Sequence, residues 1–148
     1  MTQTDIHNWI GHIGEEKAVQ IMKDKGYSIR DVNWKMGHLE MDIIAENKKE
    51  IVFVEVKTRT TTFGGKLPEE NVDIIKQKRL IAAGNAYIKM FRIEKSPRFD
   101  IIGLIVNREG EFSYMNHLEN AFVPHVRTIN SNSFTKRWSW KHRGHIIK

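Results

Sequence analysis

Two carboxylates and a lysine stand at a spacing that could hold a divalent cation and activate a water molecule. Asp42 precedes the polar segment at residues 47–50, whereas Glu55 and Lys57 follow it, at the end of an apolar run. Two adjacent carboxylates repel each other unless a cation lies between them, and Mg²⁺ suits that position because it binds carboxylate oxygens. A neighbouring lysine can orient or deprotonate the attacking water, or stabilise negative charge on a phosphate.

A β-hairpin would bring these side chains together. The pattern predicts strands over residues 39–45 and 51–58, joined by a turn at residues 47–50. Side chains alternate between the two faces of a strand, so Glu55 and Lys57 share a face. A symmetric turn places Asp42 opposite Glu55, with Cβ atoms roughly 4.5–5.5 Å apart, and Glu40 opposite Lys57. We therefore expect these four charged side chains on one face of the hairpin.

The same pattern allows a purely structural interpretation. Charged faces are common on antiparallel strands, so Glu40 and Lys57 could form a cross-strand ion pair while Asp42 and Glu55 face solvent. Against this, Glu55 lies within the apolar run at residues 51–56. A carboxylate in such a strand is expected to be partly buried, which is costly without a partner.

The remaining elements must hold this hairpin in place. Apolar periodicity predicts helices at residues 5–25 and 68–90 and, besides the hairpin, strands at residues 27–34, 99–106 and 111–117. A short helical turn is expected near residues 118–122. The resulting order, α-β-β-β-α-β-β, favours an α/β fold in which helices flank a central mixed sheet. Residues 1–123 form this expected domain, and residues 124–148 form a C-terminal tail.

Several motifs, taken in order, resemble those of the YraN-like family in the PD-(D/E)XK nuclease superfamily. They include Gly11-His12-Ile13-Gly14-Glu15, Glu40-Met41-Asp42, Val54-Glu55-Val56-Lys57 and Arg98-Phe99-Asp100. The resemblance covers about residues 8–122. It implies a restriction-endonuclease-like, three-layer core and a predicted endonuclease activity similar to that of archaeal Holliday junction resolvases. Because related resolvases act as dimers, it also implies a homodimer.

The resemblance further implies a role for each residue that matches the family pattern. Asp42 and Glu55 would bind Mg²⁺ or Mn²⁺, Lys57 would be the catalytic lysine, and Glu15 would be an accessory catalytic carboxylate. Helical angles leave Glu15 and Glu16 equivalent, and only the resemblance selects Glu15.

One departure from the family pattern concerns the first strand of the hairpin. The family's usual Gly-Glu-Ile-Asp is Leu39-Glu40-Met41-Asp42 in this chain, which keeps both acids and loses the glycine. The nearby Gly37 is a candidate to replace that glycine in the turn. Glu40 is a candidate for a further metal ligand, as is the carbonyl oxygen of Val56.

The net charge of +6 is concentrated in the tail. Residues 124–148 contain six Lys or Arg and no Asp or Glu, so residues 1–123 are formally neutral. Basic side chains contact phosphates, and interleaved aromatic side chains stack on bases. The tail is therefore a candidate DNA-binding segment, although a solvated tail is the alternative. Its candidate contacts are Arg127, Lys136, Arg137, Lys141 and Arg143.

Three further basic residues are candidates for backbone contacts with DNA. Arg59 follows the proposed site, and Lys76 and Arg79 lie one turn apart on the second predicted helix. We place Arg79 within the apolar stripe of that helix, where an arginine needs a carboxylate, a carbonyl or a phosphate. A strand-end cation at Arg59 and a snorkelling or salt-bridged Arg79 are the structural alternatives.

The composition excludes several classes of protein. The chain has 148 residues and no cysteine, so disulfide frameworks, zinc-thiolate sites and cysteine nucleophiles are ruled out. The longest apolar run, residues 101–106, is too short to span a membrane, and no signal peptide is visible. We expect a cytoplasmic protein without a membrane partner.

These observations favour a Mg²⁺- or Mn²⁺-dependent endonuclease that acts on DNA, with a preference for branched or junction structures. The first alternative is a nucleic-acid-binding or adaptor module that keeps the nuclease fold but does not cleave on its own. A small-molecule hydrolase using the same metal site is a third hypothesis, and it does not account for the basic tail.

Overall fold

The computed structural model describes residues 1–61 and 64–124. Within them the elements follow the predicted order α-β-β-β-α-β-β, with one additional 3₁₀ helix before the second α-helix. Their bounds are α1 Gln3–Asp24, β1 Ser28–Met36, β2 Leu39–Glu46, β3 Glu50–Arg59, η1 Pro68–Asn71, α2 Ile74–Phe91, β4 Ser96–Val106 and β5 Phe112–Leu118.

The strands described form one mixed sheet in the order β1-β2-β3-β4-β5. Neighbouring strands are antiparallel except for β3 and β4, which run parallel. A parallel pair needs a crossover connection, and here η1 and α2 provide it. Gly37 has φ +60° and lies in the β1–β2 turn, so the glycine that position 39 lacks is supplied two residues earlier.

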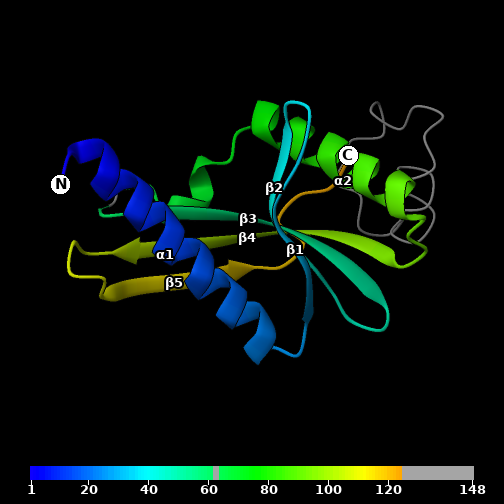
Figure 1. The fold of residues 1–148 in the computed structure, drawn as a ribbon, viewed down its shortest axis with the longest axis horizontal. Helices are drawn as coiled ribbons and strands as arrows, with labels where there is room; N and C mark the ends of the chain where they lie inside the picture. Colours follow the sequence, from blue (N-terminus) through cyan, green and yellow to red (C-terminus); the bar gives the residue numbers. More distant parts are fainter. Residues whose placement is uncertain (62–63, 125–148) are drawn as a thin grey trace.

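The two α-helices pack on opposite faces of the sheet, which gives the expected three-layer, restriction-endonuclease-like architecture. Ala18 and Met22 of α1 pack on Val52 and Val54 of β3, within one apolar cluster. Figure 1 shows α1 crossing in front of β4 and β5. The other cluster joins α2 to the opposite face and includes Leu80, Ala83, Tyr87, Phe53 and Phe99.

The second predicted helix is interrupted near its start. Pro68 begins a 3₁₀ turn instead of α2, and Asp73 caps α2 by accepting a hydrogen bond from the Lys76 amide at 2.8 Å. The predicted apolar stripe was wrong in placing Arg79 and Ile75 on the packed face, although its members Val72 and Ala83 are buried. Arg79 is exposed, and Ile75 is 62% exposed, because the packed face is formed by Leu80, Ala83, Gly84, Tyr87 and Ile88. The aromatic rings of Phe53 and Phe99, which lie against Gly84, select this face.

The helical turn expected near residues 118–122 was also wrong. Strand β5 continues to Leu118, and a non-helical turn follows in which Asn120 has φ +52°. The chain then runs back over the core, where the ring of Phe122 stacks on Phe99 with centroids 5.1 Å apart. The tail predictions from Arg127 onward lie outside the described residues. No helix in residues 1–61 and 64–124 has the length and apolar character needed to cross a membrane.

Candidate active site

The β2–β3 hairpin has the register that the sequence predicts. Ile43 pairs with Val54, and Glu46 pairs with Ile51. The turn is closed by Asn47, whose side-chain oxygen accepts hydrogen bonds from the amides of Lys49 and Glu50 at 2.9 and 2.7 Å. Because the turn fixes the register, it also fixes which side chains of the two strands become neighbours.

The carboxylates of Asp42 and Glu55 lie just beyond the last paired residues of this hairpin. Oδ2 of Asp42 accepts the amide hydrogen of Val56 at 2.8 Å, so a side chain satisfies this amide of β3. Glu55 is 6% exposed. Burial raises the pKa of Glu55 to about 7, and the negative charge of Asp42 adds to that rise. Burial also raises the pKa of Asp42, although the Val56 hydrogen bond opposes it.

Two lysines from different elements approach the same oxygen of the buried Glu55. Nζ of Lys57 lies 3.9 Å from Oε1 of Glu55, and Nζ of Lys76 lies 3.7 Å from it. Lys57 belongs to β3, whereas Lys76 comes from the first turn of α2. Both ammonium groups lower the pKa of Glu55, but burial and Asp42 outweigh them.

Helix α1 brings a third carboxylate, that of Glu15, toward the pair. A Cβ atom on Gly14 would overlap Oγ1 of Thr58, so only glycine allows α1 to lie this close to β3. The charge of Glu15 adds to the rise in the pKa of Asp42, after burial. Glu16 instead forms an exposed ion pair with His12, at 3.0 Å. The structure thus separates two glutamates that helical angles leave equivalent.

A cavity of about 130 Å³ lies between α1 and the end of β3. Glu15, Lys57 and Arg59 line it together with residues of the first three turns of α1. Arg59 also donates a hydrogen bond to the Thr58 carbonyl oxygen at 3.0 Å. Arg59, a predicted DNA contact, therefore lines the same cavity as the predicted catalytic residues Glu15 and Lys57. This cavity is large enough to hold ordered water.

Glu40 has a different partner from the carboxylate pair, namely Lys35. It is exposed, and its Oε1 is 3.9 Å from Nζ of Lys35, its neighbour on β1. In the described part of the chain, no three His, Asp or Glu side chains gather closely enough to hold a metal ion. Further oxygens around a cation would thus come from backbone carbonyls, water or substrate.

The residues present nevertheless fit a hard divalent cation. Asp42, which is half-buried, and Glu55, which is buried, offer carboxylate oxygens at adjacent positions, and their mutual repulsion raises the pKa of Glu55 in a way that a cation would reverse. Mg²⁺ and Mn²⁺ prefer such oxygen ligands, and Mg²⁺ commonly keeps several waters beside one or two carboxylates. A site with two carboxylates from the protein therefore matches this group of ions.

The comparison with known proteins agrees with the order of the motifs. The model of the uncharacterised protein family UPF0102 matches residues 14–104, which include Glu15, Asp42, Glu55, Lys57 and Lys76. The chain belongs to the UPF0102 family. UPF0102 is the YraN family, so the resemblance found in the sequence is confirmed.

Relatives in the UPF0102 family match over nearly their whole length. A UPF0102 protein of Bacteroides thetaiotaomicron is 45% identical over 118 residues, which cover 80% of this chain and 95% of the relative. One from Phocaeicola vulgatus is 44% identical over 120 residues, covering 81% and 97%. One from Caldanaerobacter subterraneus is 43% identical over 115 residues, covering 76% and 93%. These relatives fix the family and name no reaction.

The structure adds contacts that inspection of this UPF0102 sequence missed. Nδ2 of Asn33 donates a hydrogen bond to Oε2 of Glu15 at 3.0 Å, and Asn33 has φ +53° although it lies within β1. The contact between Lys76 and Glu55 was also missed. The sequence held no clear signal for this lysine, because the helix expected from residue 68 places Lys76 in its third turn, whereas α2 begins at Ile74.

A second buried charge cluster in this UPF0102 chain has a structural role. The sequence favours pairing between Arg98 and Asp100, and two hydrogen bonds of 2.8 Å confirm it. His117 lies 2.7 Å from Asp100, and Glu50 lies 3.0 Å from Arg98. Asp100 is fully buried, and hydrogen bonds hold its pKa below the usual range against the effect of burial. Arg98 and Asp100 thus satisfy each other within the fold.

Proposed function

We propose that this protein is a metal-dependent endonuclease that hydrolyses DNA phosphodiester bonds. The observation that carries the proposal is the pair of Asp42 and the buried Glu55, with the ammonium groups of Lys57 and Lys76 within 4 Å of the same Glu55 oxygen. Such a cluster combines oxygen ligands for a divalent cation with positive groups for a phosphate. Phosphodiester hydrolysis needs both.

Each side chain has a chemical task in this proposal. Asp42 and Glu55 hold Mg²⁺ or Mn²⁺, with the Val56 carbonyl as a further candidate ligand. The cation, when bound, supplies Lewis-acid stabilisation of charge on the phosphate. Lys57 orients the attacking water and stabilises the negative charge that develops on the phosphate oxygens. Glu15 acts from the cavity that it shares with Lys57, as an accessory carboxylate.

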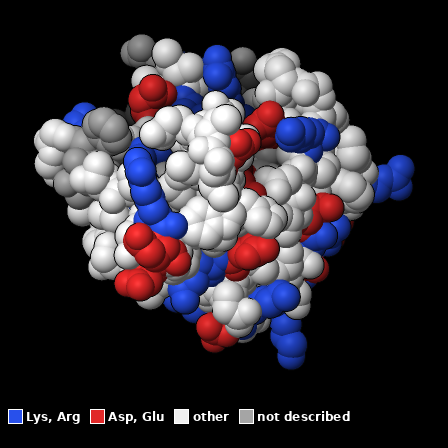
Figure 2. Space-filling view, turned by 60° about the vertical axis from the view of Figure 1, so that its left-hand side comes forward, with Lys and Arg blue, Asp and Glu red and all other residues white. Residues whose placement is uncertain are grey.

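The charge distribution favours recognition of DNA shape. Figure 2 shows Lys and Arg mixed with Asp and Glu on one face, without a uniformly basic surface. Residues 1–123 are formally neutral, and the excess of +6 belongs to residues 124–148. Arg59, Lys76, the exposed Arg79 and the tail would contact the backbone, which fixes orientation without reading bases. The resemblance to Holliday junction resolvases further implies branched or junction DNA, which we propose as the substrate, with a homodimer cutting two strands.

A cleavage assay tests this function directly. The purified protein is incubated with Mg²⁺ or Mn²⁺ and end-labelled single-stranded, duplex, flap and four-way-junction DNA. Glu55→Gln and Asp42→Asn keep the side-chain shapes while removing the charges, so both variants should lose cleavage. Glu109→Gln, at an exposed carboxylate, is the matched control and should cleave normally. Cleavage that survives in Glu55→Gln would refute the assigned site.

One observation favours a second candidate function, a DNA-binding module without cleavage of its own. In the residues that the structure describes, no third acid or histidine joins the carboxylate pair at metal-binding range. The lysines also already supply positive charge to Glu55. DNA binding without cleavage of any substrate, in either metal, would support this alternative.

A further inference from the structure

Lys76 occupies an electrostatically unfavourable place in its own helix. Asp73 caps α2 and accepts the amide hydrogen of Lys76 at 2.8 Å, which makes Lys76 the third residue of the helix. The start of a helix carries partial positive charge, so a cation there is disfavoured. Oε1 of Glu55, 3.7 Å from Nζ of Lys76, compensates for this position. Lys76 thus lies where the carboxylate pair needs a cation.

The lysines that meet Glu55 differ in their freedom to move. The side chain of Lys57 is 21% exposed and stems from β3, whereas that of Lys76 is 35% exposed and stems from a helix on one face of the sheet. Lysine carries its charge on a flexible four-carbon stem. Lys76 is therefore the lysine that can leave Glu55 and remain in solvent-accessible space.

We propose that Lys76 is a resident counter-ion of the Asp42–Glu55 pair, that a divalent cation displaces it from Glu55, and that the released ammonium binds a phosphate of the nucleic acid. This inference rests on the proposed function. It makes Lys76 a positioning residue for the substrate strand, distinct from Lys57, which stays beside the carboxylates.

The displacement follows from the charges. A divalent cation held by Asp42 and Glu55 would add two positive charges beside the carboxylate that Lys76 contacts, and it would therefore repel the Lys76 ammonium. The displaced ammonium is still tethered to α2, so the phosphate it binds lies close to the carboxylate pair. Metal binding then strengthens DNA binding, and DNA binding strengthens metal binding by the same factor, since such coupling is reciprocal.

The first experiment measures this coupling without cleavage. Fluorescence anisotropy gives the affinity for a labelled four-way junction in EDTA and in Ca²⁺, which binds the same oxygen ligands, and a gel verifies that the DNA stays intact. Ca²⁺ should tighten DNA binding by native protein about fivefold or more. In Lys76→Met this gain should disappear. Relative to native protein, the dependence of log affinity on log salt for Lys76→Met should be shallower by about 0.9 in Ca²⁺ and the same in EDTA.

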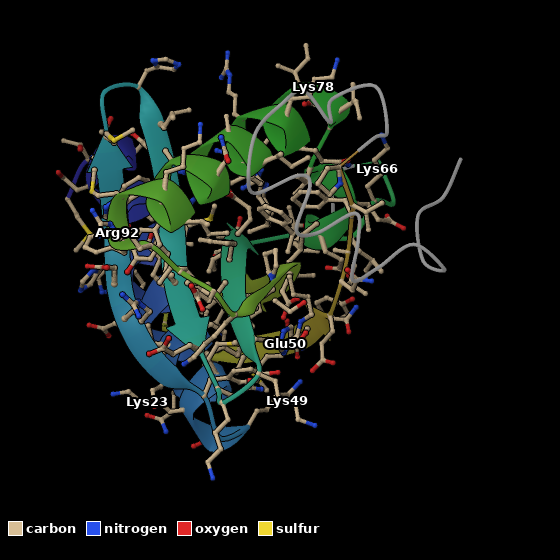
Figure 3. All side chains as sticks on the ribbon, turned by 90° about the vertical axis from the view of Figure 1, so that its right-hand side faces the viewer. Lys23, Lys49, Glu50, Lys66, Lys78 and Arg92 are labelled. Atoms are coloured by element: carbon tan, nitrogen blue, oxygen red, sulfur yellow. The ribbon has the colours of Figure 1, made fainter. Side chains whose placement is uncertain are left out.

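Lys78 provides a matched control on the same helix. It is exposed, and two residues of separation place it roughly 200° around the helix axis from Lys76. Figure 3 shows Lys78 on α2, far from Lys49 and Glu50 at the hairpin turn. Lys78→Met should keep the Ca²⁺-dependent gain. Circular dichroism and thermal unfolding of both variants verify that they fold.

The second experiment titrates Ca²⁺ into the protein without DNA, by calorimetry at pH 8.5. Lys76→Met should bind Ca²⁺ more tightly than native protein because the competing ammonium is gone, and Lys78→Met should match native protein. A Lys76→Met variant that keeps the DNA coupling, or binds Ca²⁺ more weakly, would overturn the inference. Native protein that cleaves DNA but shows no Ca²⁺ coupling defeats this inference alone, whereas loss of all DNA binding defeats the proposed function with it.

Discussion

Gly14 of α1 lies against Thr58 of β3 so closely that a Cβ atom at position 14 would overlap the threonine hydroxyl. This contact sets the distance between α1 and β3, and with it the place of Glu15 beside Asp42. Gly14→Ala should force the helix away from the sheet and destabilise the protein by about 1–3 kcal/mol, as overpacked core positions do. Urea unfolding measures the loss.

Gly11→Ala is the control for this change. Position 11 lies in the same helix with open space around its missing Cβ, so alanine there should be neutral or stabilise by about 0.5–1 kcal/mol through helix propensity. Equal destabilisation by both variants would show that helix packing at Gly14 is not the cause.

Glu55 makes the stability of the metal-free protein depend on pH. Its pKa rises from the ordinary 4.5 to about 7, so between these values the native state binds more protons than the unfolded state. Stability contributed by this group therefore falls as the pH rises from about 4.5 to 7. In EDTA at pH 8, Glu55→Gln should be more stable than native protein by up to about 3 kcal/mol, and the difference should vanish at pH 4. Glu109→Gln should show no such trend.

Divalent cations should reverse this trend. Above pH 7, where Glu55 is ionised, Mg²⁺ or Mn²⁺ binds the native state and should raise the thermal unfolding midpoint with increasing concentration. At pH 5 the protonated Glu55 should bind the cation poorly, so the midpoint should hardly move. Glu55→Gln should respond weakly at both pH values. An equal rise in this variant would place the cation elsewhere.

Glu15 and Glu16 form a matched pair for testing the accessory carboxylate. Glu15→Gln removes a charge that acts on Asp42 and should lower the cleavage rate about 10–100-fold, the usual cost of losing a group that supports metal ligands. Glu16→Gln removes a charge from the exposed ion pair with His12 and should cleave normally. If the two variants behave alike, the role assigned to Glu15 is wrong.

Truncation after Pro124 tests the basic tail. The truncated chain keeps Phe122, whose ring packs on Phe99, so the fold should survive. Its DNA affinity should fall, and its salt dependence should become shallower by up to about 0.9 for each lost phosphate contact. A full-length chain with Arg127, Lys136, Arg137, Lys141 and Arg143 changed to glutamine should behave like the truncated one. An unchanged salt dependence would exclude the tail as a DNA-binding segment.

The hairpin at the site could be predicted from the sequence because its determinants are local. The polar turn at Asn47 and the alternation along β3 fix the register, and the register makes Asp42 a neighbour of Glu55. The choice of Glu15 over Glu16 could not be made this way. It depends on how closely α1 approaches β3, and a single glycine determines that distance.

The start of α2 and the face that it buries could not be predicted from the local sequence pattern. Pro68 is a favourable first residue for an α-helix as well as for a 3₁₀ turn, so the pattern did not reveal the interruption before Asp73. The face that α2 buries depends on Phe53 and Phe99, which the chain brings together only after the crossover. Consequently Arg79 was placed on the wrong face, and the contact of Lys76 with Glu55 was not anticipated.

The order of the strands across the sheet, β1 to β5, repeats the order in which the described residues are synthesised. Each later strand therefore pairs with an edge formed by the strand before it in the chain. The β2–β3 hairpin, with Asp42 and Glu55, precedes α2 in the chain. The hairpin carries Lys57 as its own cation, whereas Lys76 reaches Glu55 only when the crossover packs on the sheet.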